Sequence, residues 1–352
     1  MQSAPLVSVV TPFYNTRDYL GECIESVLRQ THENWEYVLV DNSSNDGSAE
    51  IAEGYVARFP GKIRLIRTES FLSQVQNYNF ALTCISPDSK YCKMVQADDW
   101  LFPECIRNMV EVAETHPSVG IVAAYLLEGN EVRLGGLPYP STMVAGRDVC
   151  RLFFFRNIYV FGSPTSLLMR SDLIRSRNPF YDERYAPFED GHVCFDLLRT
   201  CDFGFVHQVL TYLRCDNAGI TSPMRQFRVG LFTQLSMLVA HGGDYLSGEE
   251  YEYCLKRAER EYFFYLAKCA CALRPETRAF WDFHRRGLAS IGYSLDWKHL
   301  ARWLPRALIE KSWDAFWRLW DKDPCPDRDA LRQPRPAEFS GADRGIARKE
   351  LG

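Results

Sequence analysis

The chain has 352 residues, of which 46% are hydrophobic and 24% are charged, and its formal net charge is −4. This length and composition indicate a globular protein with a substantial core, and the slightly negative charge argues against nucleic acid as a partner. The longest apolar stretch, residues 153–169, is interrupted by Arg156 and Asn157, which excludes a transmembrane helix there.

The twelve cysteines are scattered along the chain, and the only close pair is Cys269 and Cys271. This spacing predicts free, mostly buried thiols rather than a disulfide framework or a zinc site. The chain does not open with a charged segment followed by an apolar one, so no signal peptide is expected. These features together predict a cytoplasmic protein.

Strand and helix patterns alternate over roughly the first hundred residues. Short β-branched or apolar runs predict strands, and apolar residues at helical spacing predict amphipathic helices. The predicted strands are residues 6–10, 35–40, 63–66 and 91–95, and the predicted helices are residues 16–30, 48–58 and 74–84. The short links between these elements predict a parallel sheet with right-handed crossovers.

The rest of the chain changes character twice. Another helix and strand are predicted over residues 103–124, followed by a Gly/Pro-rich connection and a second half, residues 141–222, that covers the mouth of the sheet. From residue 223 the pattern is helical, with long helices predicted over residues 249–273 and 297–320. The tail, residues 323–352, is rich in proline and charge and is predicted to be disordered.

Polar residues follow the predicted strands where each strand ends. Thr11 follows the first strand, Asp41 the second, and Asp98 and Asp99 the fourth. In parallel sheets, ligands bind beyond the carboxyl ends of the strands. The sequence therefore predicts a ligand site at this edge.

Five segments resemble, in the same order, the motifs of family 2 glycosyltransferases. They are residues 7–15, 26–31, 40–48, 96–99 and 188–190. The resemblance implies an α/β fold of the GT-A type, a Rossmann-like and mostly parallel sheet flanked by helices, with a C-terminal helical extension. Residues 1–222 would form the catalytic domain, with a nucleotide-binding half (5–100) and an acceptor-side half (101–222), and residues 223–322 the extension.

The implied activity is inverting transfer of a sugar from a nucleotide-diphosphate sugar to an acceptor hydroxyl. The acceptor would be a glycan, a lipid-linked sugar or another hydroxyl compound in polysaccharide assembly. Such enzymes use Mn²⁺ or Mg²⁺, which prefer oxygen ligands and stabilise the charge of the leaving diphosphate. By resemblance Asp99 is the metal ligand and Asp98 contacts the ribose or the metal shell. An alternative is that the two aspartates only cap a turn.

The same resemblance assigns the nucleotide contacts. Thr11, Pro12, Tyr14, Asp41 and Asn42 would hold the base and ribose, and a carboxylate at position 41 would accept from uracil N3–H, which favours UDP. An Asx turn is the alternative for Asp41.

An inverting reaction needs a general base at the acceptor. Asp190 is assigned this role by resemblance, with Glu189 supporting it or binding the acceptor, and Arg214 is a candidate diphosphate contact. The alternative is that the acidic pair only opens a helix, where the dipole favours it. His192 is expected on a helix surface. The alternative is that it supports the general base, Asp190. Asn79 would contact the donor or make a hydrogen bond on its helix face.

Five of the eight tryptophans lie in residues 297–320, together with several lysines and arginines. This pattern favours helices that pack their aromatic residues on the catalytic domain or on a partner subunit. The alternative is peripheral contact with the inner face of a membrane, where a lipid-linked acceptor would lie.

Two other functions compete with the transferase interpretation. A nucleotidyltransferase would need a Gly-rich phosphate loop after the first strand, and residues 11–14 do not form one. A catalytically inactive module that binds a sugar or a partner on the same fold is the remaining alternative. It is favoured by Gln96 and Asn42, which replace family aspartates, and by the missing glycine loop before Asn79.

Overall fold

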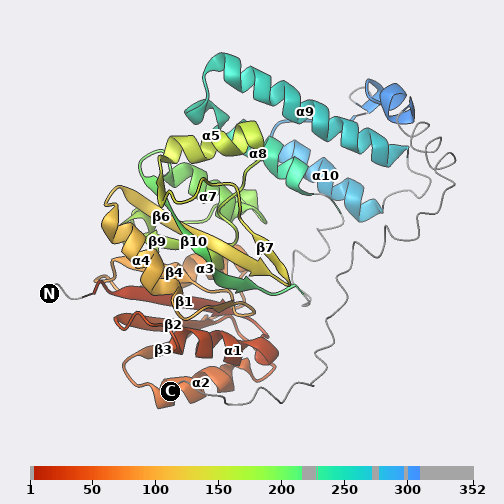
Figure 1. The fold of residues 1–352 in the computed structure, drawn as a ribbon. Helices are drawn as coiled ribbons and strands as arrows, with labels where there is room; N and C mark the ends of the chain where they lie inside the picture. Colours follow the sequence, from red (N-terminus) through yellow and green to blue (C-terminus); the bar gives the residue numbers. More distant parts are fainter. Residues whose placement is uncertain (1–3, 216–226, 228, 272–276, 297–299, 310–352) are drawn as a thin grey trace, which may run out of the picture.

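The computed structural model describes residues 4–215, 227, 229–271, 277–296 and 300–309. Within these residues one ten-stranded sheet has the order β3-β2-β1-β4-β9-β6-β10-β5, with β7 paired to β6 and β8 to β10 (Figure 1). The strands are β1 (Val7–Phe13), β2 (Trp35–Asp41), β3 (Ile63–Arg67), β4 (Tyr91–Met94), β5 (Trp100–Leu101), β6 (Val119–Glu128), β7 (Glu131–Arg133), β8 (Met143–Val144), β9 (Leu168–Arg170) and β10 (Asp202–Leu213).

The long ladders of this sheet are parallel. β1 pairs in parallel with β2 and β4, β2 with β3, and β6 with β10. Each antiparallel ladder extends over only two or three residue pairs. β9 lies antiparallel between β4 and β6 and joins the two parallel parts into one sheet. The predicted α/β class of the GT-A type, with a mostly parallel sheet, is confirmed.

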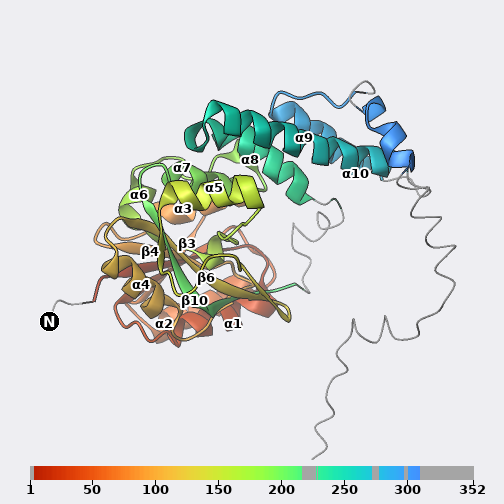
Figure 2. The same ribbon diagram turned by 45° about the horizontal axis from the view of Figure 1, so that its top comes forward.

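Helices cover both faces of the sheet (Figures 1 and 2). One apolar cluster joins the sheet to the first, second and fourth helices. A second cluster, on the opposite face, includes residues of the third, fifth and seventh helices. These helices are α1 (Arg17–Leu28), α2 (Ser48–Arg58), α3 (Gln74–Thr83), α4 (Cys105–Thr115), α5 (Gly146–Arg156), α6 (Ser171–Arg175) and α7 (Glu189–Leu197), with short 3₁₀ turns η1 (Pro164–Ser166) and η2 (Glu183–Tyr185).

The start of α3 shows how the local sequence sets an element. Ser73 caps the helix by accepting a hydrogen bond from the Gln76 backbone N–H at 3.2 Å, and the Gln76 side chain accepts from the Ser73 N–H at 3.1 Å. This capping box satisfies two N–H groups that the first turn leaves unpaired. It fixes where α3 begins, in the segment where the resemblance implied a glycine loop.

Three further helices, α8 (Val229–Tyr245), α9 (Gly248–Ala270) and α10 (Arg278–Ser290), form an outer layer over α5 and α7 (Figure 1). Their buried side chains, such as Leu235 of α8 and Tyr262 of α9, belong to the same apolar cluster as α7. The long helix predicted over residues 249–273 is confirmed as α9. The helical layer therefore shares one continuous core with the sheet.

The tryptophan-rich segment lies only partly inside the described residues. Trp303 packs against the core cluster, with its ring 6.5 Å from that of Phe264. Trp297, Trp313, Trp317, Trp320 and the predicted tail at 323–352 lie outside the described residues. For Trp303 the packing interpretation is confirmed.

Among the described residues, no helix has the length and apolar character needed to cross a membrane.

Candidate functional site

The parallel pairing brings the candidate residues to one edge of the sheet. Phe13, the last residue of β1, is in register with Asp41, the last residue of β2, and the Phe13 carbonyl accepts from the Asn42 N–H at 2.9 Å. β4 ends beside β1, and Asp98 and Asp99 follow it after a short turn. The loops after β1, β2 and β4 are therefore neighbours, as predicted.

Asp99 lies under the protein surface, with only 1% of its area exposed. Its Oδ2 accepts from the Thr165 hydroxyl at 2.7 Å, and its Oδ1 accepts from the Arg214 backbone N–H at 3.1 Å. Burial, and next the charge of Asp98, raise the pKa of Asp99 to about 7. The Asp99 carboxyl group is held in place by two hydrogen bonds, and a bound cation would stabilise its ionised form.

Thr165 is the link that fixes Asp99. Its hydroxyl also accepts from the Gln96 N–H at 3.0 Å, and its carbonyl accepts from the buried Lys93 ammonium at 2.6 Å. Lys93 lies on β4 and is fully buried. The η1 turn is thus tied to the strand that carries the aspartates, a contact between residues about seventy positions apart that the sequence does not reveal.

Arg214, which follows β10, closes the Asp98–Asp99 turn from the other side. Its Nε donates to the Asp98 carbonyl at 3.0 Å, its guanidinium pairs with Glu22, and its Cζ lies 4.8 Å from the centre of the Tyr19 ring. To bind a diphosphate, this side chain would have to exchange the Glu22 carboxylate for phosphate oxygens. Arg214 therefore lies at the Asp98–Asp99 turn.

Thr11, Pro12 and Tyr14, which were predicted to contact the nucleotide, differ in how far their side chains are exposed. The Thr11 hydroxyl is buried and shares a 2.8 Å hydrogen bond with the Tyr37 hydroxyl, so it lies in the core between β1 and β2. Pro12 is also buried, whereas Tyr14 is 43% exposed at the start of the following loop. Of these three side chains, only that of Tyr14 is available to a ligand as the structure stands.

Asp41 and Asn42, at the end of β2, fix two loops: Asp41 the loop that follows β2, and Asn42 the loop between β3 and α3. The Asp41 Oδ1 accepts from the Ser44 N–H at 2.9 Å, and its Oδ2 lies 3.6 Å from Arg67 Nε. The Asn42 amide is bidentate on the backbone of Leu72, accepting from its N–H and donating to its carbonyl, both at 2.9 Å. The side chain of Asn42 therefore fixes the loop between β3 and α3.

That loop carries an exposed aromatic residue that the sequence did not single out. Phe71 is 62% exposed, and its ring meets the Tyr14 ring edge-on with the centres 4.8 Å apart. The two rings come from the loops after β3 and β1. The sequence signal for this loop was that Phe71-Leu72-Ser73-Gln74 stands where the resemblance implies a glycine loop. The exposure of Phe71 depends on the two hydrogen bonds between Asn42 and Leu72.

The acidic pair opens α7, as predicted. Asp190 is partly buried, and its Oδ1 accepts from the Gly191 N–H at 2.7 Å. Burial, and next the charge of Glu189, raise the pKa of Asp190 to about 7. Glu189 is 6% exposed, burial raises its pKa as well, and its Oε2 has no hydrogen-bond partner among the described residues.

Tyr78 of α3 connects the two acidic groups. Its hydroxyl accepts from Gln74 at 2.7 Å and from Gln96 at 2.9 Å. Burial raises the pKa of this phenol, and the charges of Asp98 and Glu189 raise it further. The Tyr78 hydroxyl is thus tied to Gln96, two residues before Asp98, and its pKa responds to charges of both acidic pairs.

Two other predictions are decided by hydrogen bonds. The Asn79 amide is bidentate on the backbone of Tyr181, with bonds of 2.8 and 2.7 Å, which confirms the hydrogen-bonding alternative for this residue. The prediction that His192 is a surface residue was wrong. It is 2% exposed and bonds to His241 of α8 at 2.9 Å, because α8 covers the face of α7 that the helical pattern left open.

The side chains at this site supply only part of the ligands that a divalent cation needs. Asp98 and Asp99 supply carboxylate oxygens, the ligands that Mn²⁺ and Mg²⁺ prefer. The described residues contain no cluster of three or more histidine, cysteine or acidic side chains placed to hold a metal. A cation held by these two aspartates would therefore complete its shell with a donor diphosphate and water, the usual arrangement for Mg²⁺ at phosphate sites.

The comparisons with known proteins agree with this geometry. Residues 8–180 match the model of the family described as glycosyl transferase family 2. The chain is 32% identical over 156 residues to the putative glycosyltransferase EpsE of Bacillus subtilis, a match that covers 43% of this chain and 55% of EpsE. The chain thus spans little more than half the length of this curated relative. These matches support a family 2 glycosyltransferase.

Solved structures of similar shape include two sugar-transfer proteins. S. aureus TarS (residues 1–349), solved with UDP-GlcNAc, has a TM-score of 0.57 at 17% identity, covering 81% of this chain and 80% of TarS. The mannosyltransferase PcManGT of Pyrobaculum calidifontis, solved with GDP-Man and Mn²⁺, has a TM-score of 0.51 at 15% identity, covering 88% of each chain. At these identities the likeness concerns the fold.

We predict that Asp99→Asn changes thermal stability in a pH-dependent way. The pKa of Asp99 is raised in the fold to about 7, so its stabilising protonated form is complete at acid pH and is lost as the pH rises through that value. The variant, which stays neutral, should have a Tm a few degrees above wild type at about pH 8 and an equal Tm at about pH 3, below the ordinary pKa of 3.8. Asp88→Asn, at an exposed turn before β4, is the control. An equal difference at both pH values would contradict the assignment.

Proposed function

We propose that this protein is an inverting, metal-dependent glycosyltransferase that moves a sugar from a nucleotide-diphosphate sugar, a UDP-sugar, to an acceptor hydroxyl. The observation that carries the proposal is the presence of two buried acidic groups, Asp99 beyond the parallel strands and Glu189 at the start of α7. Asp98 and Asp99 lie at the carboxyl end of the parallel sheet, where donors bind, and Glu189 and Asp190 lie at the start of α7. Transfer needs one acidic pair to hold the cation that stabilises the leaving diphosphate, and a second acidic pair to take the proton from the acceptor hydroxyl.

The base and ribose are proposed to bind beyond β1 and β2. Tyr14 and Phe71 offer exposed rings to the planar base. Asp41, which ends β2 beside the end of β1 and is 2% exposed, would offer an acceptor for uracil N3–H. Asn42 serves here as the residue that fixes the Phe71 loop rather than as a base contact. The preference for uracil over cytosine rests on Asp41, because uracil N3 carries a proton and cytosine N3 is an acceptor. The preference over guanine is proposed from the family resemblance.

The metal is proposed to bind at Asp99, with Asp98 beside it. A bound Mn²⁺ or Mg²⁺ supplies Lewis-acid stabilisation of the diphosphate as it leaves. The chain's own contribution is to fix the carboxylates: Thr165 and the Arg214 N–H orient Asp99, and the Arg214 guanidinium holds the Asp98 carbonyl. Since Asp99 has a raised pKa, a cation would also bring it to its ionised form at neutral pH.

Asp190 is proposed as the general base. A base works best when its pKa lies near the operating pH, and burial together with Glu189 brings the pKa of Asp190 to about 7. The Asp190 carboxylate would take the proton from the acceptor hydroxyl as that oxygen attacks the anomeric carbon from the face opposite the diphosphate. The glycosidic bond to the donor breaks as the new bond forms, so the configuration inverts. Glu189 raises the pKa of Asp190 through its charge.

The acceptor is proposed to be a hydroxyl of a growing glycan or a lipid-linked sugar, used in polysaccharide assembly on the cytoplasmic side of a membrane. This assignment rests on the family resemblance. Contact with the membrane would have to come from tryptophans other than Trp303, because Trp303 packs on the core.

Calorimetric titration tests the donor site. We expect UDP to bind the wild-type protein in the presence of Mn²⁺ and to bind at least about tenfold more weakly without it, because the cation links the diphosphate to Asp99. GDP and CMP should bind more weakly than UDP. Asp99→Asn should lose the effect of Mn²⁺, whereas Asp88→Asn at the opposite edge of the sheet should keep it. Absence of binding for all three nucleotides would favour a binding module without transferase activity.

The base assignment predicts a specific kinetic defect. Asp190→Asn should lower kcat by about 10²–10⁴-fold and leave the UDP affinity unchanged, since a general base acts in the chemical step. The wild-type kcat should fall as the pH drops below about 7, because protonation of Asp190 removes the base. A variant with normal turnover would exclude Asp190 as the base.

Phe71 provides a separate test of the base position. Phe71→Ala should weaken binding of the nucleotide sugar about tenfold, the usual loss when a ring that stacks on a base is removed, and should leave kcat near the wild-type value. Phe71→Trp should retain the affinity. The control is Tyr139→Ala, which removes a ring that is 80% exposed and contacts only His207 among the aromatic residues described. Equal affinities for all three variants would place the base elsewhere.

A further inference from the structure

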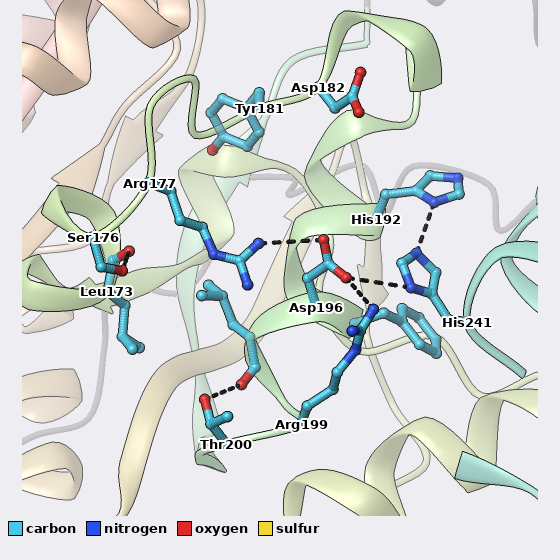
Figure 3. A network of polar contacts seen from close by, with 12 residues as sticks. Leu173, Ser176, Arg177, Tyr181, Asp182, His192, Asp196, Arg199, Thr200 and His241 are labelled. Carbon is cyan, nitrogen blue, oxygen red and sulfur yellow. Dashed lines mark hydrogen bonds and ion pairs between the residues drawn. The ribbon is translucent and has the colours of Figure 1, made fainter. Parts of the chain in front are cut away.

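A chain of buried polar groups joins the outer face of α7 to α8 (Figure 3). His192 of α7 and His241 of α8 are 2% and 3% exposed, and His192 Nδ1 lies 2.9 Å from His241 Nε2. The Ser236 hydroxyl lies 3.4 Å from His192 Nε2, and Asp196 Oδ1 lies 3.6 Å from His241 Nδ1. The proposed function uses none of these groups.

The directions of the protons follow from the chemistry of neutral imidazole, which has one donor and one acceptor nitrogen. If His241 donated to His192, its bare Nδ1 would face the Asp196 carboxylate, and two acceptors would repel. We therefore assign the opposite order: Ser236 donates to His192, His192 donates to His241, and His241 directs its N–H at Asp196. Each neighbouring pair then sets a donor against an acceptor, and at 3.6 Å the His241 N–H faces Asp196 without forming a hydrogen bond.

Both histidines are held neutral. Burial, and next the charge of His241, lower the pKa of His192 to about 3, although Asp182 opposes this shift. Burial lowers the pKa of His241 even though Asp196 and Asp244 favour its charged form, and Arg199 acts with burial. The negative charge of Asp196 is balanced by ion pairs with Arg199 at 2.6 Å and with Arg177 at 3.2 Å. The chain of groups thus keeps one arrangement at neutral pH.

Apolar contacts fix the same face of α7. The Tyr185 ring, in the η2 turn just before α7, stacks on His192 with the centres 3.7 Å apart and the planes 6° apart. A Cβ on Gly191 would come 2.2 Å from the Met237 Cε of α8, so a larger residue there would force the end of that side chain to move. The Tyr245 hydroxyl of α8 donates to the Phe195 carbonyl. These contacts begin one residue after Asp190.

We propose that α8 is a positioning element for the acceptor-side carboxylate, and that His192 and His241 hold the first turn of α7, and with it Asp190, in place. This proposal rests on the assignment of Asp190 as the base. The histidines act through α7 and do not touch the substrates. The helical layer is in this way a part of the active site's support.

The test replaces His241 by Phe, which keeps a ring against Phe195 but removes both polar contacts. We expect amide hydrogen exchange in residues 189–197 to become at least about tenfold faster, kcat to fall about 10–100-fold because the base is misplaced, and the UDP affinity with Mn²⁺ to stay within about twofold of wild type. His241→Gln, whose amide has one donor and one acceptor, should restore part of kcat.

The matched control is His284→Phe, which removes another buried histidine of the helical layer, one bonded to Tyr262 of α9 at 2.7 Å. It should lower the Tm without changing exchange in α7 or kcat. If His241→Phe does not fold, Ser236→Ala removes the outer hydrogen bond and should show smaller changes in the same direction.

Unchanged exchange in α7 with wild-type kcat would overturn the proposal, and so would an equal effect of the His284 control. If wild-type protein binds UDP but transfers no sugar to any acceptor, the proposed function fails instead. The exchange data then decide alone whether α8 positions α7.

Discussion

Burial of an acidic group in each of two pairs, Asp98–Asp99 beyond β4 and Glu189–Asp190 at the start of α7, is the constraint on which the rest of the site depends. Carboxylates removed from water are costly unless they are neutralised or hydrogen-bonded. Here the pKa values of Asp99 and Asp190 are both raised to about 7, so the fold leaves part of that cost uncompensated. Strongly shifted groups in one place are typical of functional sites, where stability is given up for reactivity. Thr165, Arg214 and Tyr78 are best understood as groups that make this arrangement tolerable.

Two asparagines, the buried Asn42 and the partly buried Asn79, hold the loops around these acidic groups in the same way. The Asn42 amide binds both backbone groups of Leu72, and the Asn79 amide binds both backbone groups of Tyr181. An amide side chain can imitate a strand partner because it has one donor and one acceptor. This device replaces the glycine loop of the family with a loop of defined shape, and it brings Phe71 out to the surface beside Tyr14.

These contacts also explain how far the sequence alone could lead. The strand ends and the acidic residues that follow them were predictable, because periodicity and local order set them. The roles of Asn42 and Asn79 were not, since their partners lie 30 and 102 positions away. His192 was misplaced for a related reason: the helical pattern of α7 alone contains no information about α8, which buries it. Long-range packing decides between a ligand contact and a positioning contact, and a single sequence does not encode that choice locally.

The helical layer changes the meaning of the domain division near residue 222. Secondary structure changes there from strands to helices, but the apolar core does not, because Leu235 and Leu238 of α8 lie in the same cluster as Val10 and Val38 of the first two strands. Arg151 of α5 makes a bidentate pair with Glu250 of α9, which adds a polar tie between the layers. A helix that carries a catalytic carboxylate needs support on the face away from the substrate. Under the proposal that Asp190 is the base, that support comes from α8, and the apolar core continues past the change in secondary structure.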